Sequence, residues 1–176
     1  FCKVWGSRSH NTNHEASDWD FSGVFMHPTR AILGIDGLPD NYVSPIGEKP
    51  DCHFHELGKF ASLLVEGNPG ILEMLWTERM AEFGEDWAIL RQERRRFLSK
   101  MAVRQYLGYA EGQLKRLKAG ARLHTTGGGY NEKWAYHLIR LLGDSNRIIQ
   151  GGEPLVWKEG PERDFLMSVR HCEITC

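Results

Sequence analysis

The segment SDWDFSGVF, residues 17–25, alternates polar and apolar side chains in the pattern of a β-strand. This alternation places Asp18 and Asp20 on the same face of the strand, with their Cα atoms roughly 6.5 to 7 Å apart. Two carboxylates so placed repel each other, and a divalent cation relieves that repulsion. Magnesium suits such oxygen ligands, because proteins commonly bind it through one or two carboxylates and substrate phosphates. The sequence therefore predicts a strand whose acids bind a metal ion together with a polyphosphate.

A shorter apolar run, CKVW at residues 2–5, ends at Gly6 and is typical of a strand that enters a tight turn. Backbone N–H groups exposed at such a turn, together with the Ser7 hydroxyl, can donate hydrogen bonds to phosphate oxygens. The turn and the acids thus indicate a site for a metal-bound triphosphate. Each also has an ordinary interpretation, as a simple turn and as a pair of acids on a solvated strand edge.

A third strand is predicted at residues 51–55, DCHFH, and it begins with Asp51. This residue supplies a third carboxylate, which a two-ion site needs if one ion activates an attacking hydroxyl. His53 and His55 share the face of Asp51, and a satisfied or solvent-facing role is the simpler reading for both. Residues 36–50, rich in proline and glycine, are predicted to form an exposed loop between the second and third strands.

The second half of the chain has helical spacing of its apolar residues from Glu56 onward. Helices are predicted over residues 57–67, 71–76, 86–118 (as one or two long helices), 131–142 and 161–171. Residues 153–157, EPLVW, can form a short hairpin arm. The triple glycine within residues 120–130 predicts a flexible loop, and it is not a P-loop because the required lysine and preceding strand are missing.

A stripe of cationic side chains is expected on the helix at residues 131–142, because Lys133, His137 and Arg140 lie at i, i+4 and i+7. A lysine directed at the cleft would neutralise charge on a pyrophosphate leaving group, and His137 would contact phosphate rather than act as a base. The ordinary interpretation is a solvated helix face. Tyr109 and Gln113, one helical turn apart on the preceding helix, are candidates for contacts with a base or ribose.

The formal charge of −1 gives no support for a large nucleic-acid footprint. A local positive run, RQERRRFLSK at residues 91–100, is ordinarily a solvated helix face. If the acceptor is RNA or DNA, this run and Lys115, Arg116 and Lys118 are where its phosphates would dock, with binding that weakens as salt rises. No apolar run approaches the ~20 residues of a membrane span, so no membrane partner and a cytoplasmic location are expected.

The four cysteines, Cys2, Cys52, Cys172 and Cys176, have no framework spacing and are interpreted as reduced thiols. His171, Cys172 and Cys176 offer only three ligands to zinc, whereas a structural zinc site needs four. The chain begins at Phe1 instead of a methionine, so we expect that a further segment precedes it.

The stretch GSRSHNTNHEASDWDFSGV resembles the signature of the DNA polymerase beta-like nucleotidyltransferase superfamily, in which a Gly-Ser element precedes an Asp-x-Asp pair by about ten residues. It is most similar to the branch of predicted nucleotidyltransferases that includes an RNA-ligase-associated group. The matching residues are Gly6, Ser7, Ser9, Thr12, Ser17, Asp18, Asp20, Gly23 and Val24. HELGKFASLLVEGNPGILEMLW and KWAYHLIRLL are similar to later helices of that branch, so the resemblance covers roughly residues 4–175. It departs from the pattern at His10, where an aromatic residue is common, and at the bulky Trp19.

This resemblance implies an α+β fold, with a small mixed sheet in residues 1–56 and a helical lobe in residues 57–176 that closes over the nucleotide. The implied activity is magnesium- or manganese-dependent transfer of a nucleoside monophosphate from a nucleoside triphosphate such as ATP. The acceptor can be a nucleic-acid end, a protein or a small molecule. The implied metal ligands are Asp18, Asp20 and Asp51, and the implied triphosphate contacts come from Gly6, Ser7, Arg8, Ser9 and Lys133.

Two other classes of function remain open. One is a catalytically inactive module of the same fold that senses nucleotides or binds nucleic acid, and the other is a protein-interaction domain. The intact carboxylates favour the enzyme over both alternatives.

Overall fold

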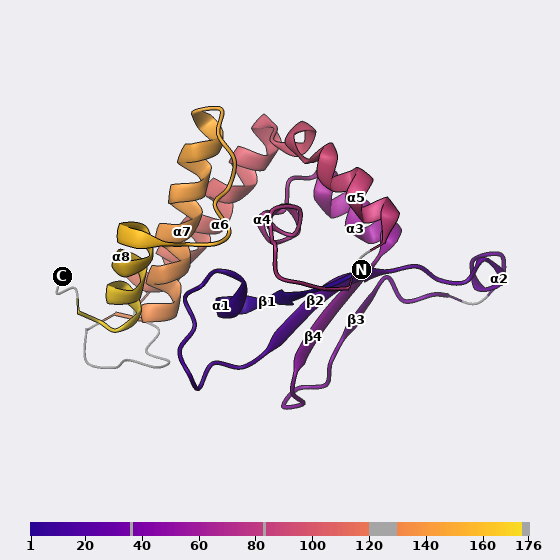
Figure 1. Cartoon of the computed structure of the whole chain (residues 1–176), viewed down its shortest axis with the longest axis horizontal. Helices are drawn as coiled ribbons and strands as arrows, with labels where there is room; N and C mark the ends of the chain where they lie inside the picture. Colours follow the sequence, from indigo (N-terminus) through magenta and orange to yellow (C-terminus); the bar gives the residue numbers. More distant parts are fainter. Residues whose placement is uncertain (36, 83, 120–129, 174–176) are drawn as a thin grey trace.

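The computed structural model describes residues 1–35, 37–82, 84–119 and 130–173. Its strands form one mixed sheet in the order β3-β4-β2-β1-β5 (Figure 1). Their bounds are Cys2–Trp5 for β1, Asp20–Phe25 for β2, Asn41–Val43 for β3, Asp51–Glu56 for β4 and Met80–Glu82 for β5. Strands β2 and β4 run parallel, and the other neighbouring strands are antiparallel. A small mixed sheet combined with helices confirms the α+β fold class.

Helices make up most of the remaining described chain. They are α1 (Gly6–Ser9), α2 (Thr29–Ile32), α3 (Leu57–Val65), α4 (Pro69–Glu73), α5 (Glu85–Gln92), the 3-10 helix η1 (Arg94–Phe97), α6 (Lys100–Lys118), α7 (Glu132–Ile149) and α8 (Gly160–Arg170). Helices α3 to α7 gather over one face of the sheet, α6 and α7 pack side by side, and α2 lies on an arm that projects from the sheet (Figure 1). None of the described helices is long and apolar enough to cross a membrane.

Capping side chains explain where several of these helices begin. Asn68 accepts a hydrogen bond from the backbone N–H of Ile71 and is followed by Pro69 at the start of α4. Ser99 caps α6 in the same way, and Asn131 caps α7. The predicted helix over residues 86–118 is therefore divided into α5, η1 and α6, because the cap at Ser99 starts a new helix.

Other elements also differ from the sequence-based expectations. The predicted loop at residues 36–50 contains β3, which pairs with β4 to form a hairpin. Residues 153–157 form no strand, and the backbone N–H of Leu155 instead donates to the Asp144 carboxylate. Helix α7 continues to Ile149, beyond the predicted end at residue 142. Most of the triple-glycine segment, residues 120–129, lies outside the described residues.

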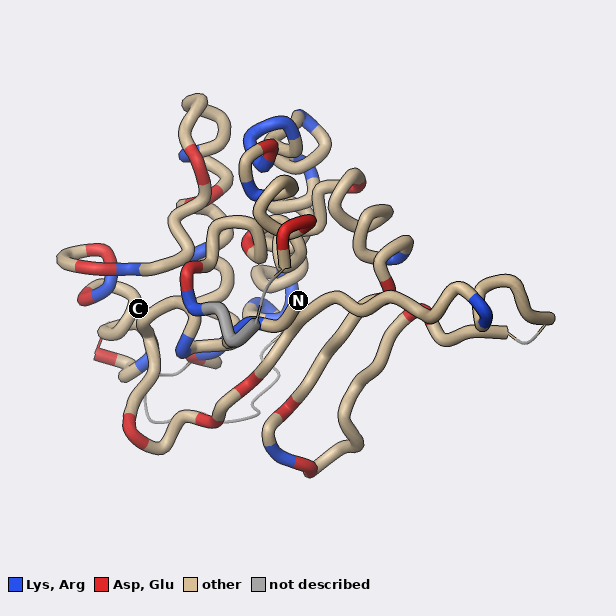
Figure 2. The backbone as a smooth tube through the Cα atoms, turned by 45° about the vertical axis from the view of Figure 1, so that its right-hand side comes forward, with Lys and Arg blue, Asp and Glu red and all other residues tan. Residues whose placement is uncertain are grey.

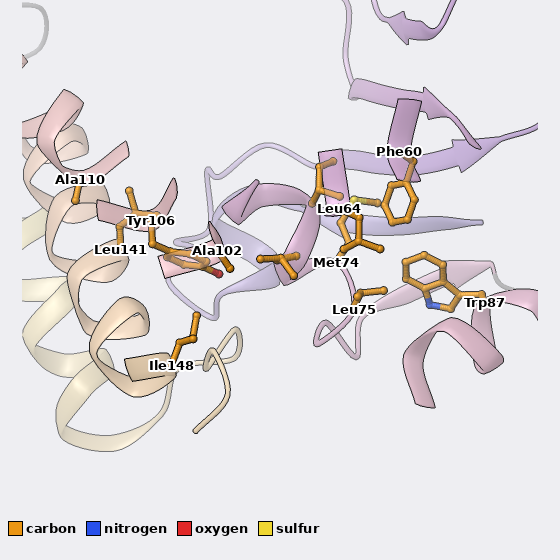
Figure 3. Packing of buried hydrophobic residues seen from close by; sticks show 12 residues of the cluster. Phe60, Leu64, Met74, Leu75, Trp87, Ala102, Tyr106, Ala110, Leu141 and Ile148 are labelled. Atoms are coloured by element: carbon orange, nitrogen blue, oxygen red, sulfur yellow. The ribbon is translucent and has the colours of Figure 1, made fainter. Parts of the chain in front are cut away.

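The hydrophobic core lies between the helices and the adjoining half of the sheet. Phe60, Leu64, Met74, Leu75 and Trp87 are packed at one end, and α6 and α7 add a second group at the other (Figure 3). The ring of Phe1 stacks on Trp87 with centroids 3.4 Å apart, so the first residue of the chain is fixed to this core. This packing covers one end of the sheet face that carries Ser22, whose hydroxyl donates to the Met74 sulfur. The other end of the same face borders a cavity.

Candidate active site

Three carboxylates line one cavity of about 990 Å³ between the sheet and α7. Asp20 and Asp51 are register partners in the parallel pair β2 and β4, and each is the first residue of its strand. Neighbouring strands lie about 4.8 Å apart, so the two side chains rise next to each other from the same face. Asp18 precedes β2 by two residues and also lines the cavity. The structure thus brings together the three acids that the sequence singled out.

The pKa of Asp20 is affected by the two other acids. Its pKa is raised by partial burial and then by repulsion from Asp51 and Asp18, whereas Lys133 and Lys49 act in the opposite direction. The folded protein therefore holds negative charges near one another at the cost of making Asp20 harder to ionise. A bound cation would remove that cost.

The Asp18 carboxylate is bonded to a cation of the protein itself. Lys49, on the turn between β3 and β4, places its Nζ 2.5 Å from Oδ1 of Asp18, and both side chains are more than half exposed. Asp51 accepts a hydrogen bond of 3.1 Å from the Ser44 hydroxyl on the same hairpin. Among the described residues, no three His, Cys, Asp or Glu side chains converge on one point. Carboxylate oxygens are the donors that magnesium and manganese prefer, and Lys49 competes for one oxygen of Asp18.

The glycine–serine turn forms α1, a single helical turn that follows β1. Gly6 has a φ of +66°, and a β-carbon at this position would lie only 2.1 Å from Oδ2 of Asp20. Glycine therefore allows the α1 backbone and the Asp20 carboxylate to approach each other closely. Gly6 and Ser7 both line the cavity, so the predicted phosphate-binding turn faces the predicted metal ligands.

Arg8 and Ser9, which follow Gly6 and Ser7 in this turn, do not line the cavity. Ser9 is buried, its hydroxyl donates to the backbone oxygen of Gly6, and it does not line the cavity. Arg8 also lies outside the cavity lining, and its guanidinium donates to the backbone oxygens of Ser17 and Asp18. The structure therefore does not place either side chain where it would contact a triphosphate in the cavity, because both are engaged with backbone oxygens.

The wall opposite the acids comes from α7. Lys133, His137 and Arg140 line the cavity, and Lys133 is the exposed member of the three. Burial, followed by the charges of Arg140, Lys133 and Arg170, lowers the pKa of His137 to about 3. The imidazole is therefore neutral at pH 7, and it can donate one hydrogen bond without adding charge.

Arg140 is the deepest member of this wall. Only 8% of the residue is exposed, and its Nη1 lies 2.6 Å from Oε1 of Glu73, which is fully buried. The hydroxyl of Tyr106 donates to the same carboxylate oxygen, and the Asp144 carboxylate lies 3.9 Å from the guanidinium. A phosphate that approached Arg140 would compete with Glu73 for this guanidinium.

The floor of the site contains groups that sequence reasoning did not assign to it. His10 lines the cavity, is paired through Nδ1 with the backbone oxygen of Val156, and has a pKa lowered well below its ordinary value, chiefly by burial. Lys3 lies outside the cavity lining: it is fully buried with its Nζ 4.0 Å from the Trp5 ring, and burial lowers its pKa well below the ordinary value. The departure from the family pattern at His10 was the only sequence signal among these.

Other residues of the lining come from α7 and α8. The guanidinium of Arg170 lies over the Tyr136 ring and donates to the backbone oxygen of Thr12, and the Tyr136 hydroxyl is bonded to the Thr12 hydroxyl. These contacts join α8 and α7 to the segment after α1. No local spacing in the sequence indicates them, because the three segments are far apart along the chain.

The expected base or ribose contacts from α6 are not supported. Tyr109 and Gln113 do not line the cavity. The Tyr109 hydroxyl accepts a hydrogen bond of 2.9 Å from the Asn68 side chain, and Gln113 carries a buried side-chain oxygen.

The basic run extends from the end of α5 through η1 to the first residue of α6, and Figure 2 shows Lys and Arg in blue along the backbone. Glu153 forms ion pairs with Arg94 and Arg95, and Arg96 pairs with Glu93. Lys115, on α6, pairs with Glu111. These acids reduce the positive charge that the run offers to a nucleic acid.

The zinc expectation involved the end of the chain. Cys176 lies outside the described residues, and His171 pairs with Glu173 at 3.7 Å.

The chain was compared with known protein families, curated proteins and solved structures. A protein-family model described as "RNA repair pathway DNA polymerase beta family" matches residues 1–163, a range that includes the three acids, the glycine–serine turn and α7. No curated protein and no solved structure matches the chain significantly.

Proposed function

This chain belongs to the RNA repair pathway DNA polymerase beta family, and from that premise we propose that it is a metal-dependent nucleotidyltransferase. The observation that carries the proposal is the parallel register of Asp20 and Asp51, which brings both carboxylates together with Asp18 into a cavity bordered by Gly6 and Ser7. Carboxylates opposite a turn that can donate hydrogen bonds to phosphate suit phosphoryl transfer, because catalysis of this reaction consists mainly of positioning and charge stabilisation.

The metal ligands would be Asp18, Asp20 and Asp51. When bound, magnesium or manganese would neutralise negative charge on the phosphates and favour the ionised form of the acceptor hydroxyl. Asp20 supports this role because its pKa is raised by partial burial and then by repulsion from Asp51 and Asp18, and a cation would relieve that repulsion. Lys49 must release Asp18 for the full set of ligands to be available.

The nucleotide would lie between the turn and α7. Backbone N–H groups after Gly6 and the Ser7 hydroxyl would hold the triphosphate, and Lys133 would stabilise the pyrophosphate as it leaves. His137, neutral at pH 7, would donate a hydrogen bond to a phosphate oxygen. Arg140 would act mainly through the electrostatic potential of the wall, because Glu73 already holds its guanidinium.

The reaction would be an in-line substitution at the α-phosphorus of a nucleoside triphosphate. The acceptor oxygen forms a new bond to this phosphorus while the bond to the bridging oxygen of the β-phosphate breaks, and pyrophosphate departs with that electron pair. The acceptor proton would pass to the Asp51 carboxylate and from there to solvent. The product is the acceptor esterified with a nucleoside monophosphate.

The acceptor is proposed to be the hydroxyl end of a nucleic acid. The printed description of the family supports RNA in particular, since it refers to an RNA repair pathway. The cavity volume of about 990 Å³ is at the upper end of the ~300 to 1,000 Å³ typical of ligand sites, so a nucleotide leaves room for an acceptor terminus.

The test is transfer of label from α-labelled nucleoside triphosphates to RNA or DNA ends in magnesium, with pyrophosphate release measured in parallel. Asp20→Asn and Asp51→Asn are expected to abolish transfer. Asp40→Asn is the matched control, because Asp40 is exposed, pairs with Lys59 and does not line the cavity. Equal pyrophosphate release by all four proteins would contradict the proposal, and tight nucleotide binding without turnover on any acceptor would favour the inactive sensing module.

A further inference from the structure

Arg8 makes an unusual set of contacts at the edge of the site. Its Nη2 donates to the backbone oxygen of Ser17 at 2.7 Å, and its Nε donates to the backbone oxygen of Asp18 at 3.1 Å. The guanidinium carbon also lies 4.3 Å from the centre of the Trp19 ring. One side chain on α1 therefore holds three consecutive residues that lead into β2.

These contacts match the chemistry of arginine. The planar guanidinium presents donors in a rigid fork, which can reach two carbonyl oxygens at once, and its face stacks on an aromatic ring. The bulky Trp19 between the two acids also stacks on Phe21, with ring centroids 6.5 Å apart. The stack with Arg8 explains why an aromatic side chain is useful at position 19.

The contacts also bear directly on the acids. Asp18 and Asp20 flank Trp19, and the carbonyl group of Asp18 is one of the two that Arg8 holds. Gly6, two residues before Arg8, is the residue against which the Asp20 carboxylate lies. The strand entry and α1 are thus joined twice, once at Gly6 and once at Arg8.

We propose that Arg8 is a positioning residue for the metal-binding acids, and not a phosphate ligand. Its fork and stack fix the backbone from Ser17 to Trp19 against α1, so that Asp18 and Asp20 face the cavity opposite Ser7. This inference rests on the proposed metal-dependent function. It differs from the expectation that Arg8 contacts the triphosphate, because its Nε and Nη2 donate to backbone oxygens and the residue does not line the cavity.

The test measures metal and nucleotide binding separately. Arg8→Lys keeps the positive charge but loses the fork, and Trp19→Leu keeps an apolar side chain but removes the stack. The Kd for Mn²⁺ is measured without nucleotide by electron paramagnetic resonance of the free ion. Binding of a fluorescent ATP is measured in EDTA. Arg79→Lys is the matched control, because Arg79 stacks on Trp157 at 4.8 Å and neither residue lines the cavity.

Loss of a residue that orients metal ligands typically weakens metal binding by 10- to 100-fold, so we expect on the order of tenfold weaker Mn²⁺ binding in Arg8→Lys and Trp19→Leu. Nucleotide binding in EDTA should stay within about twofold of wild type in both variants, and Arg79→Lys should change neither Kd. Thermal unfolding of each variant identifies a temperature at which all of them are folded, and binding is compared there.

Unchanged Mn²⁺ affinity in Arg8→Lys would overturn the proposal. If the same variant bound nucleotide more weakly in EDTA, Arg8 would be a phosphate ligand after all. A wild-type protein that binds no Mn²⁺ would contradict the metal-dependent function itself, and the positioning role with it. Failure of the positioning role alone is recognised by normal Mn²⁺ binding in the wild type and in both variants.

Discussion

The Asp20 carboxylate lies against the α-carbon of Gly6, so closely that a β-carbon on residue 6 would come within 2.1 Å of Oδ2. Two features meet at this contact, the entry of β2 and the left-handed backbone of the turn after β1. It links the residue proposed to bind metal with the residue proposed to bind phosphate.

Gly6→Ala should damage both stability and metal binding. Alanine at a φ of +66° costs about 1–2 kcal/mol of unfolding free energy, and the added methyl group forces the Asp20 carboxylate to move. Urea unfolding and Mn²⁺ titration would check the two effects. Gly108→Ala on α6 is the control: it has open space around it, and it should instead stabilise the protein by roughly 0.5–1 kcal/mol. Normal Mn²⁺ affinity in Gly6→Ala would contradict the proposed contact.

Lys49→Ala should tighten Mn²⁺ binding in the absence of nucleotide. Lys49 competes with the metal for Asp18, and one unit charge at 4 Å from another is worth about 1 kcal/mol in water, so we expect a roughly three- to tenfold lower Kd. Because the pair is exposed, the effect should shrink as salt is raised. Lys59→Ala, which removes a similar pair with Asp40, should leave the Kd unchanged. If Lys49→Ala and Lys59→Ala had the same Kd for Mn²⁺, Lys49 would not compete with the metal for Asp18.

His137→Gln should flatten the decline of stability in acid. The folded-state pKa of about 3 lies below the ordinary value of 6.5, so the unfolded chain binds more protons and stability is lost as the pH falls below about 6.5. The contribution of this one group approaches about 1.4 kcal/mol per pH unit. Unfolding free energies are measured at pH 7.5, 6.5 and 5.5. The difference between wild type and His137→Gln should shrink or change sign as the pH falls. A pH dependence in His137→Gln as steep as that of the wild type would contradict this explanation.

Arg140→Met should destabilise the protein strongly by leaving Glu73 without its cation. Breaking one partner of a buried ion pair typically costs about 3–5 kcal/mol, and Glu73 is fully buried. The double variant Arg140→Met/Glu73→Met should recover part of this loss, because it removes the uncompensated charge. Arg96→Met breaks an exposed pair with Glu93 and should cost less than about 1 kcal/mol. A mild effect of Arg140→Met, with stability near that of Arg96→Met, would show that the ion pair with Glu73 is unimportant.

Much of the sheet could be predicted from local patterns. The alternation in residues 51–55 correctly assigned β4, and that in residues 17–25 located β2, although the strand begins only at Asp20 and leaves Asp18 ahead of it. The family resemblance is confirmed by the match over residues 1–163. The register of Asp20 with Asp51 could not be derived in this way, because it depends on how a long connection lets two strands run parallel. The sequence therefore indicated which acids matter, whereas their alignment required the fold.

Side-chain roles were harder to predict, for two physical reasons. Helical periodicity put Lys133, His137 and Arg140 on one helix face, and all three line the cavity. Periodicity carries no information on depth, so it could not reveal that Glu73 holds Arg140. Arg8 follows the glycine–serine turn in sequence, and its contacts depend on the approach of Ser17 and Asp18 in space. The periodicity of a sequence indicates which face of a helix or strand a side chain is on. It does not indicate which residues of other elements that side chain contacts.

The projecting arm with α2 belongs to the connection between the two strands that carry Asp20 and Asp51. Since the ladder aligns these acids, the length of the connection beyond the sheet has little influence on their spacing, and longer loops cost little additional entropy. The tip of the arm therefore offers a place to graft a fluorophore or an affinity tag, at which the protein could be immobilised or followed in real time without crowding its cavity.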